Sequence, residues 1–171
     1  MLTAIINALR AVPPEVATVI LAMIPIGELR GALPVALTVY KLPLAEAMFL
    51  AIAGNMLPVY FLLVFFEKIA EWSRVHSRTA DRFFDYLFAR TRVKLQGNVT
   101  KYGVWALALF VAIPLPVTGA WTGTLAAFVF GLPRARSFWA IFVGVCISAV
   151  IVLVVTAGTV FTIRGIWGNN F

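Results

Sequence analysis

The stretch Pro25–Pro34 reads PIGELRGALP and lies inside a run of Val, Ile, Leu and Ala. It places an acid and a base, Glu28 and Arg30, among two glycines and two prolines. Proline removes a backbone donor and glycine is a weak helix former, so a helix is expected to break here. The stretch therefore predicts a broken helix that carries opposite charges into apolar surroundings.

The composition identifies these surroundings. Hydrophobic residues make up 62% of the 171 residues and charged residues 12%, and the mean hydropathy is +0.97. Soluble domains have about 45–50% apolar and about 25% charged residues. We therefore predict an all-α integral membrane protein. The N-terminal residues lack the pattern of a cleaved signal peptide, and the single cysteine, Cys146, excludes an internal disulfide. No metal site and no cofactor are expected.

Four apolar segments follow along the chain. Two are long enough to span a bilayer, and we predict transmembrane helices at 44–66 and 137–163. The other two, 13–40 and 102–132, are broken by PIGELRGALP and by PLPVTGAWTG. Their arms of about 9–13 residues reach only halfway through a core of about 30 Å. Irregular backbone at that depth must be buried or line a wet cavity. We predict two re-entrant hairpins; a kinked helix that crosses fully is the alternative for each.

The two halves of the chain match each other at a spacing of 89 or 90 residues. The matching pairs are Ile24-Pro25 with Ile113-Pro114, Leu42-Pro43 with Leu132-Pro133, and Gly54 with Gly144. Internal repeats are common in transporters. We predict a first repeat at 1–66 and a second at 102–171. With one re-entrant hairpin each, the two repeats are inverted, and their tips can meet near the midplane.

Residues 67–101 connect the repeats and hold most of the charges. Apolar residues recur there at spacings of three or four, which predicts an amphipathic helix, either on the membrane surface or packed on the protein's own cytoplasmic side. In the inverted arrangement, ten of the fourteen basic residues share the face of this linker. The positive-inside rule then predicts a cytoplasmic linker, with both termini outside a prokaryotic plasma (inner) membrane. The net charge of +7 suits anionic lipid better than nucleic acid.

Charges at the first tip need partners, water or a function, because each costs roughly 2.5–3.5 kcal/mol at the membrane centre. Glu28 is the candidate proton carrier. Arg30 offers a forked donor for an anionic group, beside the positive end of a helix. The candidate tip backbone comprises Pro25, Gly27, Gly31 and Pro34. A purely structural ion pair is the alternative, and the two side chains can also face apart.

The second tip carries no charge. Its candidate substrate-binding or proton-binding residues are Thr118, Trp121 and Thr122, and Asn55 on the first spanning helix is a further candidate. The candidate tip backbone comprises Pro114, Pro116, Gly119 and Gly123. Small residues that only pack helices are the alternative for this tip. For Asn55 the alternative is a bond to a neighbouring helix.

ELRGALP in the first half and IPLPVTGAWTG in the second resemble the bacterial and archaeal family of small multidrug export proteins over nearly the whole chain. More distantly, the chain is similar to the DedA superfamily, which includes polyprenyl-phosphate flippases and relatives of lipid scramblases. That resemblance implies two re-entrant hairpins, with Glu28 and Arg30 as the functional pair. The DedA pattern usually has arginines around the second-tip proline motif, whereas residues 113–118 have none. This departure argues against phosphate-lipid binding at the second tip, and a phosphate contact would then depend more strongly on Arg30.

These features predict a small secondary transporter, an exporter coupled to protons that moves an amphiphilic or ionic solute. The alternative is a translocase for a phosphate-bearing lipid such as polyprenyl phosphate, and a third class is a membrane-organising protein. The sequence shows no nucleophile–base arrangement and no phosphate-cradling loop, so an enzyme is not expected. Expected partners are membrane lipids, the transported molecule, protons and a second copy of the chain. Two spanning helices and two short hairpins form only a thin wall around a water-filled cavity, which favours a homodimer.

Overall fold

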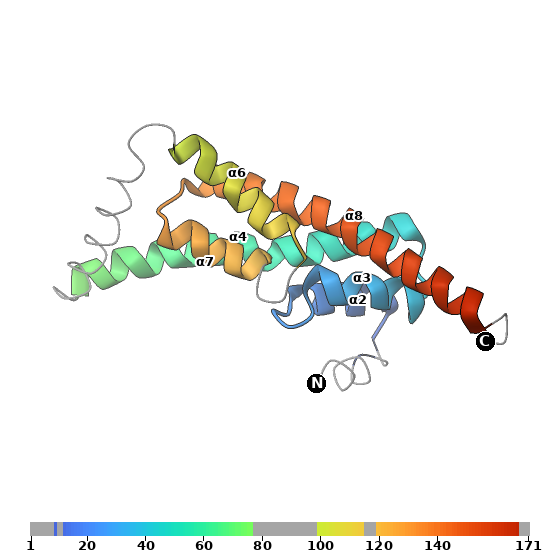
Figure 1. The fold of residues 1–171 in the computed structure, drawn as a ribbon. Coiled ribbons are helices and arrows are strands. Elements are labelled where there is room, and N and C mark those ends of the chain that lie inside the picture. The colour runs from blue at the N-terminus through green and yellow to red at the C-terminus, as the bar shows by residue number, and fades with distance from the viewer. Residues whose placement is uncertain (1–8, 10–11, 77–98, 115–118, 168–171) are drawn as a thin grey trace. The chain divides into compact units, whose positions relative to one another are not determined.

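The computed structural model describes residues 9, 12–76, 99–114 and 119–167. These residues form only helices and turns, without strands (Figure 1). The helices are α2 (Pro14–Met23), α3 (Glu28–Thr38), α4 (Leu44–His76), α6 (Val99–Ala112), α7 (Ala120–Val129) and α8 (Arg134–Trp167). The all-helical prediction is confirmed for this part of the chain. Residues 77–98 of the predicted linker, and Pro116 and Thr118 of the second tip, lie outside the described residues.

Two helices, α4 and α8, are long and apolar enough to cross a membrane. Their apolar parts are Leu44–Phe66 and Arg134–Thr159, which cover the predicted span 44–66 and most of 137–163. Helix α4 continues to His76, into the start of the predicted linker. It does so because residues 67–76 contain no proline or glycine that would end it.

The first broken segment forms a helical hairpin in which α2 and α3 pack against each other. The chain turns within residues 24–27, where the carbonyl oxygen of Ile24 accepts from the N–H groups of Gly27, at 3.2 Å, and Glu28, at 2.9 Å. The break is shorter than the motif, because Gly31 and Pro34 lie inside α3. The Gly31 N–H donates to the Gly27 carbonyl at 2.8 Å, so the first turn of α3 is closed between its two glycines.

The second broken segment has the same order of elements, and α6 packs against α7. The four hairpin helices contain 10, 11, 14 and 10 residues. At about 1.5 Å per residue, each is shorter than the hydrocarbon core of about 30 Å. These lengths agree with the predicted re-entrant path, which stays a prediction.

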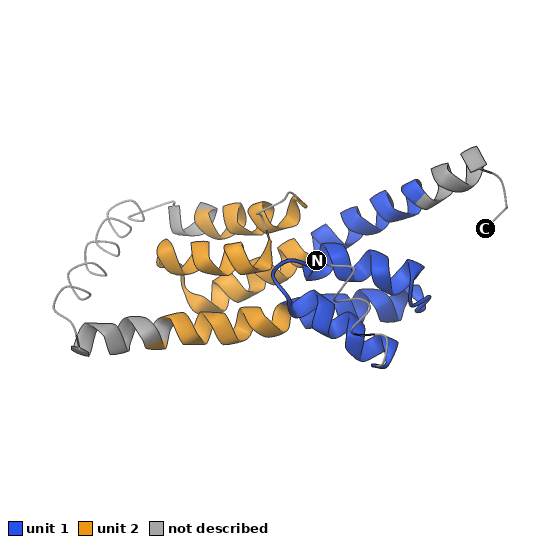
Figure 2. Cartoon of the chain, turned by 90° about the horizontal axis from the view of Figure 1, so that it is seen from below, with its two compact units in different colours: residues 1–55, 146–171 blue, residues 56–145 orange. Residues whose placement is uncertain are grey.

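The chain divides into two compact units (Figure 2). Unit 1 comprises residues 1–55 and 146–171, and unit 2 comprises residues 56–145. Each unit contains one hairpin, the first part of the long helix that follows it, and the last part of the other long helix. Both boundaries therefore fall inside a long helix, after Asn55 in α4 and after Val145 in α8.

In unit 1, α2 and α4 come so close at Gly54 that no side chain fits between them. A Cβ atom on Gly54 would lie 2.7 Å from the carbonyl oxygen of Val19 and 2.9 Å from the Cβ of Ala22. Small residues allow such close backbone approach in membrane helix pairs. Gly54 is therefore the contact point of the first hairpin with the first long helix.

Unit 2 repeats this contact between α6 and α8. A Cβ atom on Gly144 would lie 2.6 Å from the carbonyl oxygen of Ala108 and 2.8 Å from the Cβ of Val111. These three residues follow Gly54, Val19 and Ala22 by 90, 89 and 89 positions. The sequence correspondence therefore has a counterpart in the packing.

The turns after α3 and α7 also correspond. Lys41 has a φ angle of 55° and Gly131 has one of 60°, and the two are 90 residues apart. Glycine adopts this left-handed conformation without steric cost, whereas lysine does not. The same left-handed turn thus follows both hairpins, and after the first hairpin it is formed by lysine, which this conformation disfavours.

The interior of the hairpins contains many small side chains beside a few leucines such as Leu21 and Leu33, and many large apolar side chains lie outside. Buried alanines include Ala17, Ala22, Ala32 and Ala36 in unit 1 and Ala108, Ala120 and Ala127 in unit 2. Exposed large side chains include Phe49, Phe61, Trp105, Trp139 and Val154. In lipid, helices associate through close packing rather than by hiding apolar surface, which explains this distribution.

Candidate functional site

Glu28 begins α3 at the break of the first hairpin. Its carboxyl side chain is 11% exposed, and its φ angle of 43° lies in the left-handed region. A residue with a side chain costs about 1–2 kcal/mol there. Such strain persists only where the surrounding structure enforces it, and it is concentrated at functional sites.

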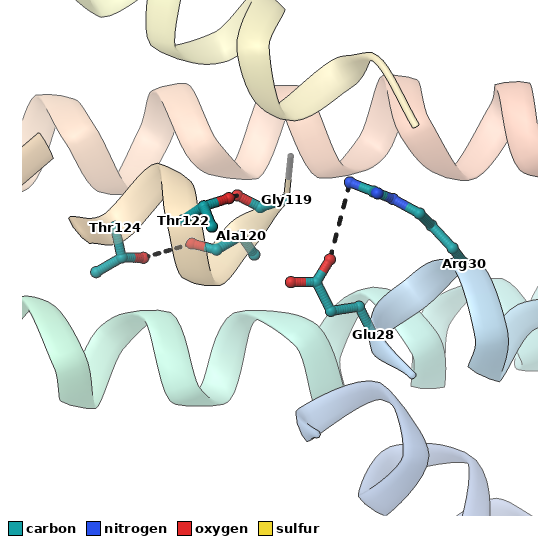
Figure 3. Close-up of polar contacts among 6 residues, drawn as sticks. All are labelled: Glu28, Arg30, Gly119, Ala120, Thr122 and Thr124. Atoms are coloured by element: carbon teal, nitrogen blue, oxygen red, sulfur yellow. Dashed lines mark hydrogen bonds and ion pairs between the residues drawn. The ribbon is translucent and has the colours of Figure 1, made fainter. Parts of the chain in front are cut away.

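Arg30 pairs with Glu28 (Figure 3). The Arg30 Nη2 and Glu28 Oε2 atoms are 3.9 Å apart, and the Arg30 side chain is 23% exposed. Residues two apart on a regular helix do not face each other. The left-handed backbone of Glu28 takes its side chain off the regular helical direction. The sequence leaves open whether the two side chains face apart, and the structure brings them together.

The position of Glu28 suits a negative charge for a second reason. The first turn of a helix carries the positive end of the helix dipole. The preceding residue, Gly27, provides no capping side chain. The carboxylate thus interacts with two positive features, the Arg30 guanidinium and the start of α3.

Asn55 adds a buried polar group to unit 1. It is 3% exposed, and its Oδ1 atom has no hydrogen-bond partner among the described residues. It directly follows Gly54, which contacts Ala22 near the end of α2. A buried acceptor without a donor costs about 1–3 kcal/mol. The alternative role of Asn55, a bond to a neighbouring helix, is therefore not filled by this oxygen within the described part of the chain.

Trp121, Thr122 and Gly123 of the second tip lie in the first turn of α7 rather than in irregular chain. The Thr122 hydroxyl donates to the carbonyl oxygen of Gly119 at 3.3 Å (Figure 3). Thr124 donates to the carbonyl oxygen of Ala120 at 2.6 Å. Both hydroxyl protons are used inside the helix, so these side chains offer a ligand mainly their lone pairs.

Gly123 has a packing role. A Cβ atom at this position would lie 2.6 Å from Cγ2 of Val111 on α6. Of the other candidates, Pro114 and Gly119 flank the part of the tip that is not described, and Trp121 is partly exposed. Glu28, Arg30 and Asn55 belong to unit 1, and Trp121 and Thr122 belong to unit 2. Among the described candidates, the structure brings Glu28 and Arg30 together as a charged pair.

Two further buried hydroxyl groups are not among the candidate residues predicted from the sequence. Tyr40 Oη and Ser137 Oγ are buried without a hydrogen-bond partner in the described part of the chain. Ser137 lies in the first turn of α8, where its position corresponds to Ala47 of the first repeat. The replacement of a buried alanine by serine between the repeats is the signal that points to it.

The chain matches the model of a protein family described as "putative small multi-drug export protein" over residues 28–151. The matched region begins at Glu28 and includes α3, α4, α6, α7 and half of α8. No curated protein and no solved structure matches the chain.

Proposed function

The chain belongs to the small multi-drug export protein family, and we propose that it is a small secondary transporter that exports an amphiphilic or ionic solute in exchange for protons. The family name and the two long apolar helices indicate a membrane protein. Export is not an enzyme class, which agrees with the sequence prediction. The observation that carries the proposal is the strained, largely buried Glu28 beside Arg30 at a helix break.

The pair offers a simple coupling mechanism. When Glu28 is ionised, it holds Arg30, and the site has no net charge. When Glu28 takes up a proton, its carboxyl group loses the negative charge that attracts a cationic solute. A proton and a cationic solute therefore compete for the Glu28 carboxylate, as export in exchange for protons requires. A second polar group of unit 1, the Asn55 oxygen, has no partner within the described ranges and can accept a hydrogen bond from the solute.

The proposed arrangement of the chain in the membrane is based on the two repeats. The corresponding contacts at Gly54 and Gly144 support an internal repeat. We take the hairpins as re-entrant and the repeats as inverted, with the linker in the cytoplasm, both termini outside and two copies of the chain in the assembly. Thr118, Trp121 and Thr122 then serve the second tip as uncharged contacts for the solute.

The alternative is a DedA-like translocase that binds the phosphate of a lipid at Arg30. The ion pair favours the exporter, because the guanidinium that would bind the phosphate already contacts the Glu28 carboxylate. The second tip provides no arginine in residues 113–118 that would take over this contact.

Glu28→Gln tests the coupling. Glutamine preserves the shape of the side chain but cannot carry a proton, so ethidium transport driven by a pH gradient should fall to the rate of protein-free vesicles. Proton release from the vesicle lumen, followed with an internal pH dye on adding ethidium, should disappear as well. Glu46→Gln, which changes an exposed acid at the start of α4, should transport like the wild type.

Thermal unfolding of the Glu28→Gln protein in detergent separates lost coupling from lost folding. Gradient-driven transport at the wild-type rate by a folded Glu28→Gln protein would exclude Glu28 as the proton carrier.

A further inference from the structure

Unit 2 contains an apolar groove between the two arms of its hairpin. Its volume is about 500 Å³, within the range of about 300–1,000 Å³ that is usual for ligand sites. The residues Gly103, Ala106, Leu107 and Phe110 of α6 form one wall, and Ala126, Phe130 and Leu132 form the other. Ligand sites usually add a few polar groups, and this lining has none. The groove therefore fits a hydrocarbon chain.

The corresponding residues of the first hairpin are buried. Ala17 and Leu21 correspond to Ala106 and Phe110 at the spacing of 89 residues. Ala17 and Leu21 are buried, at 0% and 1% exposure, whereas Phe110 is 39% exposed and Ala106 is also exposed. The positions that line the groove in the second hairpin are thus covered in the first, so the repeated fold does not by itself expose them.

Basic side chains follow directly after one end of the groove. Leu132 belongs to its wall, and Arg134 and Arg136, two and four residues later, are exposed in the first turn of α8. The residues at these positions in the first repeat are Leu44 and Glu46. The two arginines therefore occur only beside the open hairpin, next to the end of its groove.

We propose that unit 2 binds one anionic phospholipid, with an acyl chain in the groove and the headgroup phosphate against Arg134 and Arg136. Guanidinium groups bind phosphate through paired hydrogen bonds, and basic residues at a membrane surface attract anionic lipids. Exposed Trp139, one turn further along α8, is a residue type enriched at the membrane–water interface. The site uses neither Glu28 nor Arg30, so it goes beyond the transport function and does not depend on it.

Native mass spectrometry tests the site on protein released from vesicles of equal parts phosphatidylglycerol and phosphatidylethanolamine. The wild type should retain one phosphatidylglycerol per chain. Ala106→Phe fills the groove from an exposed position and should retain none. Ala157→Phe is the matched control, because Ala157 is exposed on α8 outside the groove, and it should retain the lipid like the wild type.

The headgroup contact is tested separately. Arg134→Gln and Arg136→Gln should each reduce the preference for phosphatidylglycerol about fivefold, while a phospholipid of either kind still fills the groove. Lys41→Gln removes an exposed cation from the corresponding turn of the first repeat and should leave the preference unchanged.

Three results would overturn the proposal. The first is equal lipid retention by Ala106→Phe and Ala157→Phe. The second is a wild type that retains both phospholipids equally. The third is an Ala106→Phe protein that changes from dimer to monomer with its lipid retained, which would make the groove an interface between two copies of the chain.

Discussion

Alanine in place of Gly54 or Gly144 is expected to lower the free energy of unfolding by about 1–3 kcal/mol, the usual cost of overpacking. The new Cβ atom would lie within 2.7 Å of a backbone carbonyl oxygen in both cases. A backbone atom cannot rotate away as a side chain can, so α2 must separate from α4, or α6 from α8. A methyl group thus costs more here than alanine gains as a helix former, about 1 kcal/mol over glycine.

The measurement is unfolding of the purified protein in mixed micelles, by heat or by increasing sodium dodecyl sulfate. Gly158→Ala on α8 is the control, because a Cβ atom there meets nothing within 4 Å. It should leave stability unchanged or raise it by up to about 1 kcal/mol. If Gly54→Ala and Gly144→Ala behave like Gly158→Ala, the helices do not approach as closely as described. Similar losses at both glycines would support the internal repeat.

Arg30→Gln is expected to destabilise the protein by about 2–3 kcal/mol. Breaking a fully buried ion pair costs about 3–5 kcal/mol, because the remaining charge has lost its partner. Arg30 is 23% exposed, so a value below that range is expected. The double variant Glu28→Gln/Arg30→Gln removes both charges and should be more stable than Arg30→Gln alone. The left-handed backbone at position 28 remains in all three variants.

A double-mutant cycle measures this coupling, with Glu28→Gln as the other single variant and the same unfolding assay. Arg136→Gln changes an exposed arginine and should stay within about 0.5 kcal/mol of the wild type. Strictly additive losses would mean that the 3.9 Å contact contributes nothing to stability. The pair would then have no energetic link through which a proton could affect Arg30.

Much of the fold was predictable because the relevant signals are local. The apolar part of α4, Leu44–Phe66, coincides with the predicted span. Helix α2 ends at Met23, just before the Ile24-Pro25 pair. The length of an apolar segment and the missing N–H group of proline affect only nearby residues. Both can therefore be recognised without knowing the rest of the structure. Local signals were weaker where proline is tolerated, as at Pro34 in α3 and Pro58 in α4.

The candidate site was predictable only in part. The sequence identified Glu28 and Arg30 as unusual, but their contact depends on the φ angle of Glu28, which no local pattern announces. It also proposed Thr122 as a ligand, which stays a prediction; the Thr122 hydroxyl donates to the Gly119 carbonyl oxygen, so only its lone pairs remain for a solute. The groove between α6 and α7 left no sequence signal except the correspondence with the first hairpin.

By itself, the sequence determined that the chain is an all-helical membrane protein with two long apolar helices. It also determined where the two shorter apolar segments break, because composition and backbone chemistry act locally. The tertiary structure decided which distant segments meet within each unit, Gly54 with Val19 and Gly144 with Ala108, and it formed the groove of the second hairpin. The contacts at the two glycines depend on shape complementarity between helices that are far apart in the chain. No pattern of neighbouring residues encodes that complementarity.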